Sequence, residues 1–253
     1  MVYVIKSASA PLYKSDKGSE RADEALHGMA VTVEDECSSR LLVRTGYRYM
    51  GWIERLHLCP YTVDGSHYIT AFAADVLETP KVQAPLLICL TLGCTVRLIE
   101  EVDGWTRIAL ADGREGYVRS AFLAPFSAPF QIEHTRKSVS RTAKLYLGVQ
   151  YRWGGKSPYG IDCSGLCFMA YWLNGIAIYR DARIEPGFPM KEISPSCARE
   201  SDLLFFPGHV GMLLDENTMI HSSESNNGVA IEAITSEWRS RITAAASLQA
   251  LIS

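Results

Sequence analysis

The sequence predicts an α+β protein in which two small β-barrels precede an α+β domain with an antiparallel sheet. Three observations predict this fold class. The first half repeats itself with an offset of 65 residues, a segment with two prolines follows, and the second half changes to helical and then to strand periodicity. The predicted domains are residues 1–66 and 67–124 for the two barrels and 125–253 for the α+β domain.

The internal repeat is the evidence for the two barrels. Residues 28–33 align with 93–98, and residues 51–58 align with 116–123. Both copies contain short runs of alternating apolar and polar residues, separated by Gly, Asp and Pro, which is typical of short strands joined by turns. Because two copies are too few for a solenoid, the pattern favours two small barrels in tandem.

The second half begins with a segment, 124–129, whose two prolines and serine are typical of a domain boundary. Apolar residues then recur at three- and four-residue steps, which predicts a helix with Ser138 as its N-cap. A second helix is expected to begin at Cys163 and to end near Gly175. Four short strands joined by turns are predicted after it, at residues 203–206, 209–214, 219–221 and 229–232.

Composition excludes several classes of partner. A net charge of -3 and a pI near 6.1 provide no basic surface for nucleic acid or an anionic membrane, so neither is an expected partner. The N-terminal residues lack the apolar core of a signal peptide, and we therefore expect a cytoplasmic protein. Seven cysteines without paired spacing argue against a disulfide framework and a zinc cage, and no metal or cofactor is expected.

Cys163 is the candidate nucleophile. It follows a Gly- and Pro-rich loop and is expected to be the first residue of a helix, where unpaired backbone N–H groups and the helix dipole stabilise a thiolate. The alternative is a small buried cysteine that only packs, since free Cys is among the most buried residue types. Cys167, one helical turn further, is expected to pack into the core.

Two histidines are candidates for the partners of this cysteine. If strands 209–214 and 219–221 form a hairpin, His209 and His221 lie near each other at one end of the sheet. One imidazole can then accept the thiol proton and later protonate a leaving amine, while the second ring orients the first. A metal site formed by the same three residues is an alternative, but the spacing supplies no fourth ligand.

At these residues the chain resembles the NlpC-type cell-wall peptidases, papain-like cysteine enzymes that cleave bonds to diamino acids in bacterial peptidoglycan. The resemblance covers about residues 138–234 and implies that Cys163 is the nucleophile, His209 the general base and acid, and His221 the orienting group. The matching segments, in the family's order, are YRWGG at 151–155, DCSGL at 162–166, DLLFF at 202–206, HVGM at 209–212 and IHSS at 220–223.

The same resemblance implies which residues contact substrate. Tyr151 would line the oxyanion side of the cleft. Asp162 and Ser164, which flank the cysteine, would also be substrate-binding residues. Backbone N–H groups at the helix start would meet the oxyanion. Relatives often have Ser before the base histidine, whereas this chain has Gly208, which puts a substrate hydrogen bond from that position in doubt.

A finer resemblance concerns residues 179–182. This YRDA segment is similar to an Arg-Asp-Ser element in the subgroup that hydrolyses γ-D-glutamyl-diamino acid bonds in peptides with a free N-terminal L-Ala. Asp181 would then bind the substrate ammonium, since a carboxylate in a closed pocket rejects an acylated amine. The alternative for Asp181 is a surface ion pair with Arg180 or Arg183. Ala182 replaces the Ser of relatives and leaves one peptide contact in doubt.

The ends of the two repeats, residues 51–58 and 116–123, resemble bacterial SH3-like domains. Such modules commonly bind peptidoglycan or shape the cleft of a neighbouring enzyme, although they can also serve only as stable bulk. In the subgroup named above, a tyrosine of the first SH3-like domain narrows the cleft. Tyr49 is the first choice for that wall and Tyr47 the second.

The resulting expectation is a cytoplasmic cysteine endopeptidase that releases L-Ala-D-Glu from recycled murein tripeptides or tetrapeptides with a free L-Ala amine. Two alternatives stay open. One is an exported endopeptidase acting on intact cell wall, and the other is a catalytically inactive protein that binds wall fragments.

Overall fold

The computed structural model describes residues 1–37, 39–60, 65–125 and 132–251, and the chain divides into two compact units, Met1–Ser127 and Ala128–Ser253. The predicted domain boundary after residue 124 lies three residues before this division. Residues 126–129 of the predicted linker lie outside the described residues. Both predicted barrels lie in the first unit, so the boundary between 66 and 67 stays a prediction.

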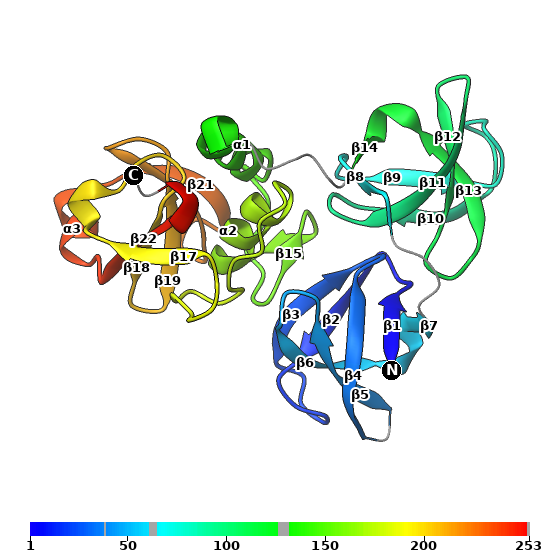
Figure 1. Ribbon diagram of the computed structural model, residues 1–253, viewed down its shortest axis with the longest axis horizontal. Helices are drawn as coiled ribbons and strands as arrows, with labels where there is room; N and C mark the ends of the chain where they lie inside the picture. Colours follow the sequence, from blue (N-terminus) through cyan, green and yellow to red (C-terminus); the bar gives the residue numbers. More distant parts are fainter. Residues whose placement is uncertain (38, 61–64, 126–131, 252–253) are drawn as a thin grey trace. The chain divides into compact units, whose positions relative to one another are not determined.

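The first unit contains two seven-stranded antiparallel sheets with the same strand order (Figure 1). The order in the first sheet is β3-β2-β6-β5-β4-β1-β7 and in the second β10-β9-β13-β12-β11-β8-β14. The strands of the first sheet are β1 (Val2–Ile5), β2 (Ser9–Tyr13), β3 (Arg21–Leu26), β4 (Ala30–Cys37), β5 (Arg40–Thr45), β6 (Met50–Glu54) and β7 (Leu58–Pro60), with the 3-10 helix η1 (Arg55–His57) before β7. Those of the second are β8 (His67–Ile69), β9 (Ala74–Leu77), β10 (Leu86–Leu90), β11 (Thr95–Val102), β12 (Trp105–Ala109), β13 (Glu115–Arg119) and β14 (Leu123–Pro125), with η2 (Ser120–Phe122) before β14.

The repeat in the sequence is therefore a repeat in structure, because β4 and β11, like β6 and β13, begin 65 residues apart. The glycine that opens each repeated ending has a packing reason. A Cβ at Gly51 would lie 2.8 Å from the Leu12 side chain, and one at Gly116 would lie 2.7 Å from Val76. Within the described residues, the strand order of neither sheet closes on itself.

A buried histidine joins the two halves of the first unit. His27 is fully buried, and its Nδ1 lies 2.9 Å from the Lys6 carbonyl oxygen while its Nε2 accepts the Ala111 N–H at 3.1 Å. Burial lowers the pKa of His27. This bonding pattern requires the neutral ring, because a protonated Nε2 could not accept the amide hydrogen.

The second unit combines helices with one antiparallel sheet of order β17-β22-β18-β19-β20-β21 (Figure 1). The four strands that the sequence predicts are present, and α2 begins at Cys163 as expected. The elements are α1 (Ile132–Leu145), β15 (Lys156–Ser157), β16 (Gly160–Ile161), α2 (Cys163–Trp172), β17 (Met190–Ile193), η3 (Pro195–Cys197), β18 (Leu203–Phe206), β19 (His209–Leu213), β20 (Thr218–Ser223), β21 (Gly228–Ala233), α3 (Ser236–Ser240), β22 (Ala244–Leu248) and η4 (Gln249–Leu251).

The expected N-cap at Ser138 is wrong, since α1 begins at Ile132 and Ser138 lies inside the helix. The buried stripe of α1 starts one turn earlier than its apolar residues suggest, because the polar Thr135 is 5% exposed and lies four residues before the fully buried Val139. In the described part of the chain, no helix is both long enough and apolar enough to cross a membrane.

Candidate active site

The nucleophile end of the site is the start of α2. Asp162 caps this helix: its carboxylate accepts the Gly165 N–H at 2.6 Å and also the Gly154 N–H at 2.8 Å. Cys163 follows as the first helical residue and is 7% exposed. The first N–H groups of a helix have no intrahelical acceptor, so they are available to an oxyanion formed beside the thiol.

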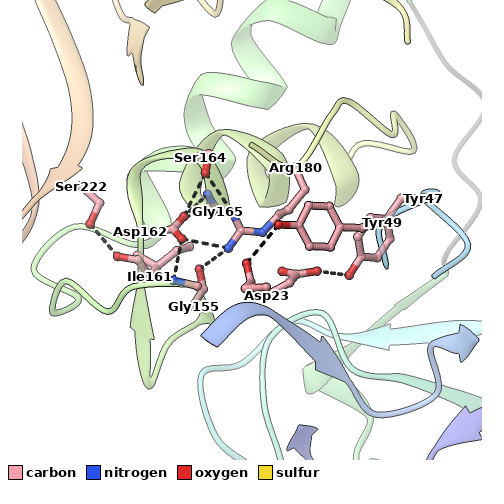
Figure 2. A network of polar contacts seen from close by, with 12 residues as sticks. Asp23, Tyr47, Tyr49, Gly155, Ile161, Asp162, Ser164, Gly165, Arg180 and Ser222 are labelled. Atoms are coloured by element: carbon pink, nitrogen blue, oxygen red, sulfur yellow. Dashed lines mark hydrogen bonds and ion pairs between the residues drawn. The ribbon is translucent and has the colours of Figure 1, made fainter. Parts of the chain in front are cut away.

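Arg180 forms hydrogen bonds with the capping residue Asp162 (Figure 2). Its side chain is 1% exposed and its two terminal nitrogens lie 3.0 and 3.1 Å from the two carboxylate oxygens of Asp162. The same guanidinium donates to the Ser164 Oγ at 2.9 Å and to the Gly155 carbonyl at 3.1 Å. One buried cation thus joins the Gly-rich loop to the first turn of α2.

Two glycines permit this close packing. A Cβ added to Gly165 would lie 2.2 Å from the Gly155 carbonyl oxygen, and one added to Gly155 would lie 2.2 Å from the Gly160 carbonyl oxygen. Neither contact is sterically possible for a larger residue. The glycines of the loop and of the DCSG segment are therefore required by the approach of two backbone segments.

The base end of the site lies on β19 and β20, which form a hairpin. The structure brings the two predicted histidines together: His209 Nε2 lies 2.8 Å from His221 Nδ1. His221 is fully buried, and its Nε2 lies 3.1 Å from Glu232 Oε2 and 3.3 Å from Asn226 Nδ2. Gly208, which replaces the Ser of relatives, has a φ of 68°, a conformation that favours glycine.

Trp238 of α3 packs beside both imidazole rings. Its ring centroid lies 5.5 Å from that of His221, in an edge-to-face arrangement, and 6.1 Å from that of His209. It also contacts Phe206, whose centroid lies 4.9 Å away. The indole therefore covers the histidine pair with apolar surface, which lowers the local dielectric.

The two reacting groups favour their neutral forms. Burial, with the Asp162 charge second, raises the pKa of Cys163 to about 11, although hydrogen bonds from the Val210 and Ser164 backbone act in the opposite direction. Burial, with His221 second, lowers the pKa of His209 to about 4. Burial outweighs the stabilisation of a thiolate by the helix terminus, so the neutral thiol of Cys163 and the neutral imidazole of His209 are favoured.

Tyr151 and Ser222 connect the two ends. Burial, followed by the Cys163 charge, raises the pKa of Tyr151 to about 12, so this phenol stays protonated near the nucleophile. Ser222, next to His221, donates its hydroxyl to the Ile161 carbonyl at 2.7 Å, and Ile161 directly precedes the Asp162 cap (Figure 2). The hairpin and the helix start are therefore tied together by a buried hydrogen bond.

A pocket in the second unit opens beside the nucleophile. Asp181 and Tyr179 lie in its wall, as does Ser164, the neighbour of Cys163. The remaining lining residues are Cys167, Ile178, Arg183, Glu185, Phe188, Met190, Leu203, Phe205 and Val210. Cys167 is 1% exposed, as expected for a packing residue.

The predicted residues of the first unit lie in the β5–β6 connection. Tyr47 is 3% exposed and donates its hydroxyl to Asp23, while the Tyr49 hydroxyl donates to the Ala22 carbonyl at 3.4 Å. The role of Tyr49 or Tyr47 as a cleft wall stays a prediction. So do the substrate contacts of Tyr151, Asp162, Ser164 and Asp181.

Sequence reasoning missed three residues of the site. Arg180 was considered only as a partner for Asp181, whereas the structure pairs it with Asp162 and pairs Arg183 with Glu185. The sequence pattern indicates Glu232 only as the end of a predicted strand and indicates no role for Ser222. The roles of these three residues depend on strand register and on burial, which cannot be read from the linear sequence.

A cysteine at a helix start, with two hydrogen-bonded histidines on the adjoining sheet, is the arrangement of a cysteine hydrolase. Residues 148–247 match the NlpC/P60 family. The chain is 41% identical to dipeptidyl-peptidase 6 of Lysinibacillus sphaericus, over 91% of each protein. The chain belongs to the NlpC/P60 family, whose members are cysteine peptidases.

Two further similarities are informative. A γ-D-glutamyl-L-lysine dipeptidyl-peptidase of Bacillus subtilis is 30% identical over 54% of this chain and 48% of its own length. The crystal structure of an NlpC/P60 family protein from Bacillus cereus superposes with a TM-score of 0.83, over 97% of this chain and 98% of that one, at 20% identity. The second comparison shows that the fold of that protein is shared over nearly the whole chain.

Proposed function

We propose that this protein hydrolyses the γ-D-glutamyl-diamino acid bond of murein tripeptides and tetrapeptides that carry a free N-terminal L-Ala, releasing L-Ala-D-Glu. The observation that carries the proposal is the position of Asp181 in the pocket that also contains Ser164, the neighbour of Cys163. The names of two relatives, a dipeptidyl-peptidase and a γ-D-glutamyl-L-lysine dipeptidyl-peptidase, support release of a dipeptide.

The chemistry begins from the neutral pair. His209 accepts the proton of Cys163 as Sγ attacks the γ-glutamyl carbonyl carbon, and N–H groups at the start of α2 stabilise the oxyanion. The C–N bond then breaks while the imidazolium returns the proton to the leaving amine of the diamino acid. Water, deprotonated by His209, hydrolyses the thioester and regenerates the thiol.

The selectivity follows from charge. An L-Ala ammonium in the pocket would pair with the Asp181 carboxylate, whereas an acylated amine carries no charge to pair with it. Arg183 and Glu185 also line this pocket, where they form an ion pair at 2.9 Å.

We further propose that the reaction serves peptidoglycan recycling in the cytoplasm. All seven cysteines, including the exposed Cys197, are free thiols, and this supports a reducing compartment. Free N-terminal L-Ala arises once the glycan has been removed from the stem peptide, so the preferred substrate is a product of amidase-type cleavage.

The test compares L-Ala-γ-D-Glu-L-Lys with its N-acetylated form. The wild-type protein is expected to cleave the free peptide about a hundred-fold better in kcat/KM, since loss of the hydrogen bond between the charged ammonium and Asp181 costs roughly 1.5–3 kcal/mol. Asp181→Asn should reduce this ratio several-fold, whereas Glu192→Gln, an exposed acid on β17, should leave it unchanged. Cys163→Ala should abolish turnover. Equal cleavage of the two peptides by wild type would contradict the selectivity, and no cleavage of either would contradict the activity.

A further inference from the structure

Glu232 lies beside the histidine pair although it belongs to no motif. Its Oε2 lies 3.1 Å from His221 Nε2, and its Oε1 accepts from Asn226 Nδ2 at 2.9 Å. The register of β20 and β21 explains this approach. His221 pairs with Ala230 and Met219 pairs with Glu232, so His221 and Glu232 are diagonal neighbours on one face of the sheet.

The carboxylate determines which nitrogen of His221 carries hydrogen. An ionised carboxylate only accepts hydrogen bonds, so its short contact with Nε2 is favourable only when Nε2 is protonated. The Asn226 amide does not reverse this assignment. Its NH2 group donates to Glu232 Oε1 at 2.9 Å, and its 3.3 Å approach to His221 Nε2 is longer than the 3.1 Å contact of the carboxylate with the same nitrogen. The neutral His221 ring therefore has its lone pair on Nδ1.

The same constraint passes to His209. Its Nε2 lies 2.8 Å from His221 Nδ1, and because that Nδ1 is an acceptor, the Nε2 of His209 must be the donor. A neutral imidazole has only one N–H, so the lone pair of His209 is on Nδ1. Nδ1 is thus the atom of His209 that can accept the proton of Cys163.

We propose that Glu232 is a positioning residue of this peptidase, which fixes the Nε2–H tautomer of His221 and thereby presents Nδ1 of His209 as the general base. Without the carboxylate, the hydrogen bond between the two rings can equally run in the opposite direction, with hydrogen on His221 Nδ1 and on His209 Nδ1. In that state His209 has no lone pair for the thiol. The proposal uses the peptidase activity only for its kinetic test.

Surrounding charges fit this role. Burial lowers the pKa of His221, and the Glu232 charge and hydrogen bond oppose that effect. The charge of Arg241 lowers the pKa of His209, whereas Glu232 raises it. When His209 receives the thiol proton, the hydrogen-bonded chain to Glu232 therefore stabilises the imidazolium.

The kinetic test replaces the carboxylate by an amide of the same shape. Glu232→Gln can donate to or accept from His221, so it no longer selects a tautomer. We expect kcat on the free tripeptide to fall about ten-fold, with KM within two-fold, below the roughly 10²- to 10⁴-fold loss of a missing general base. Glu237→Gln removes an equal charge from an exposed position in the first turn of α3 and should change neither constant. An unchanged kcat in Glu232→Gln would overturn the proposal, as would an equal loss in Glu237→Gln.

A second measurement does not require activity. Nitrogen-15 NMR of the histidine rings in the wild-type protein, assigned with His221→Asn and His209→Asn, reports which ring nitrogen is protonated. We expect His221 and His209 both to carry hydrogen on Nε2, and Glu232→Gln to populate the opposite tautomers. Hydrogen on Nδ1 of His221 in the wild-type protein would overturn the assignment even if Glu232→Gln did not fold or if the tripeptide were not a substrate.

Discussion

The two ends of the active site are built on different electrostatic principles. At the nucleophile end, Asp162 and Arg180 form a charged pair whose members are 7% and 1% exposed. At the base end, burial favours the neutral rings of His209 and His221, and Glu232, whose side chain is 32% exposed, lies 3.1 Å from His221. The charged pair fixes the backbone at the start of α2, whereas the histidine pair accepts and returns the proton of Cys163.

This difference separates stability from chemistry. A buried ion pair that has lost one partner costs about 3–5 kcal/mol, so the nucleophile end does not tolerate substitution of either member. A neutral hydrogen-bonded ring can exchange its proton at lower cost, because no charge is stranded in the interior when it does so. We therefore expect substitutions at the nucleophile end to unfold the site and those at the base end to change rates.

The largest effect should come from His209→Ala. Removal of the general base is expected to lower kcat/KM on the free tripeptide by roughly 10²- to 10⁴-fold. Because His209 is only partly buried at the start of β19, the melting temperature should change little. The measurement is steady-state kinetics with calorimetry, and His67→Ala, a half-buried histidine of the first unit, is the control. Large destabilisation by His209→Ala would remove the contrast between the two ends.

Arg180→Met tests the nucleophile end. It leaves the Asp162 carboxylate buried without its cation, and we expect a loss of about 3–5 kcal/mol in the free energy of unfolding. Arg183→Met, in the same segment but 61% exposed, should cost less than about 1 kcal/mol. Denaturant unfolding measures both. A loss below 1 kcal/mol for Arg180→Met would show that the pair does not hold the helix start.

Adding Asp162→Asn to Arg180→Met should recover part of the lost stability, since the stranded charge is then removed while Asn can still cap α2. No recovery in the double variant would indicate that the guanidinium acts through the Gly155 carbonyl and the Ser164 hydroxyl rather than through Asp162.

Local patterns account for what could be predicted from the sequence. The repeated segments that begin with Gly51 and Gly116 identify the two β-units in the sequence. Each glycine is required because a side chain at its position would clash with a neighbouring strand. The strands that carry His209 and His221 are short, apolar and bounded by turns, so their pairing follows from the chain order.

Long-range geometry accounts for what could not be predicted. Arg180 meets Asp162 across 18 residues that include α2 and the irregular segment after it. The diagonal contact of Glu232 with His221 depends on the β20–β21 register. The neutral state of Cys163 was missed for the same reason, because burial in the folded core is not visible in the sequence.

The pH dependence of turnover should report the base end. The pKa of His209 is lowered to about 4, so the ring stays neutral as pH falls from 7 and becomes protonated only below about 4. A protonated ring cannot accept the thiol proton, and kcat/KM should therefore be flat from neutral pH to about 5 and fall as pH decreases through about 4. Cys163, with a pKa of about 11, should add no limb on the acid side. An acid limb centred near 6.5 would show that burial does not control this ring.

Ser222→Ala should have the smallest effect and tests how the two ends are joined. The lost hydroxyl leaves the Ile161 carbonyl without its 2.7 Å hydrogen bond, which should cost about 1–3 kcal/mol in stability. Because Ile161 precedes the capping Asp162, the hairpin and the start of α2 would also be less well aligned. We therefore expect kcat of the folded protein to fall several-fold. Ser223→Ala, whose hydroxyl contacts only the neighbouring loop at Ser225 and Asn226, is the matched control. If both serine variants show the same kcat, the two ends are aligned by the packing of α2 on β19 and β20 instead of by this bond.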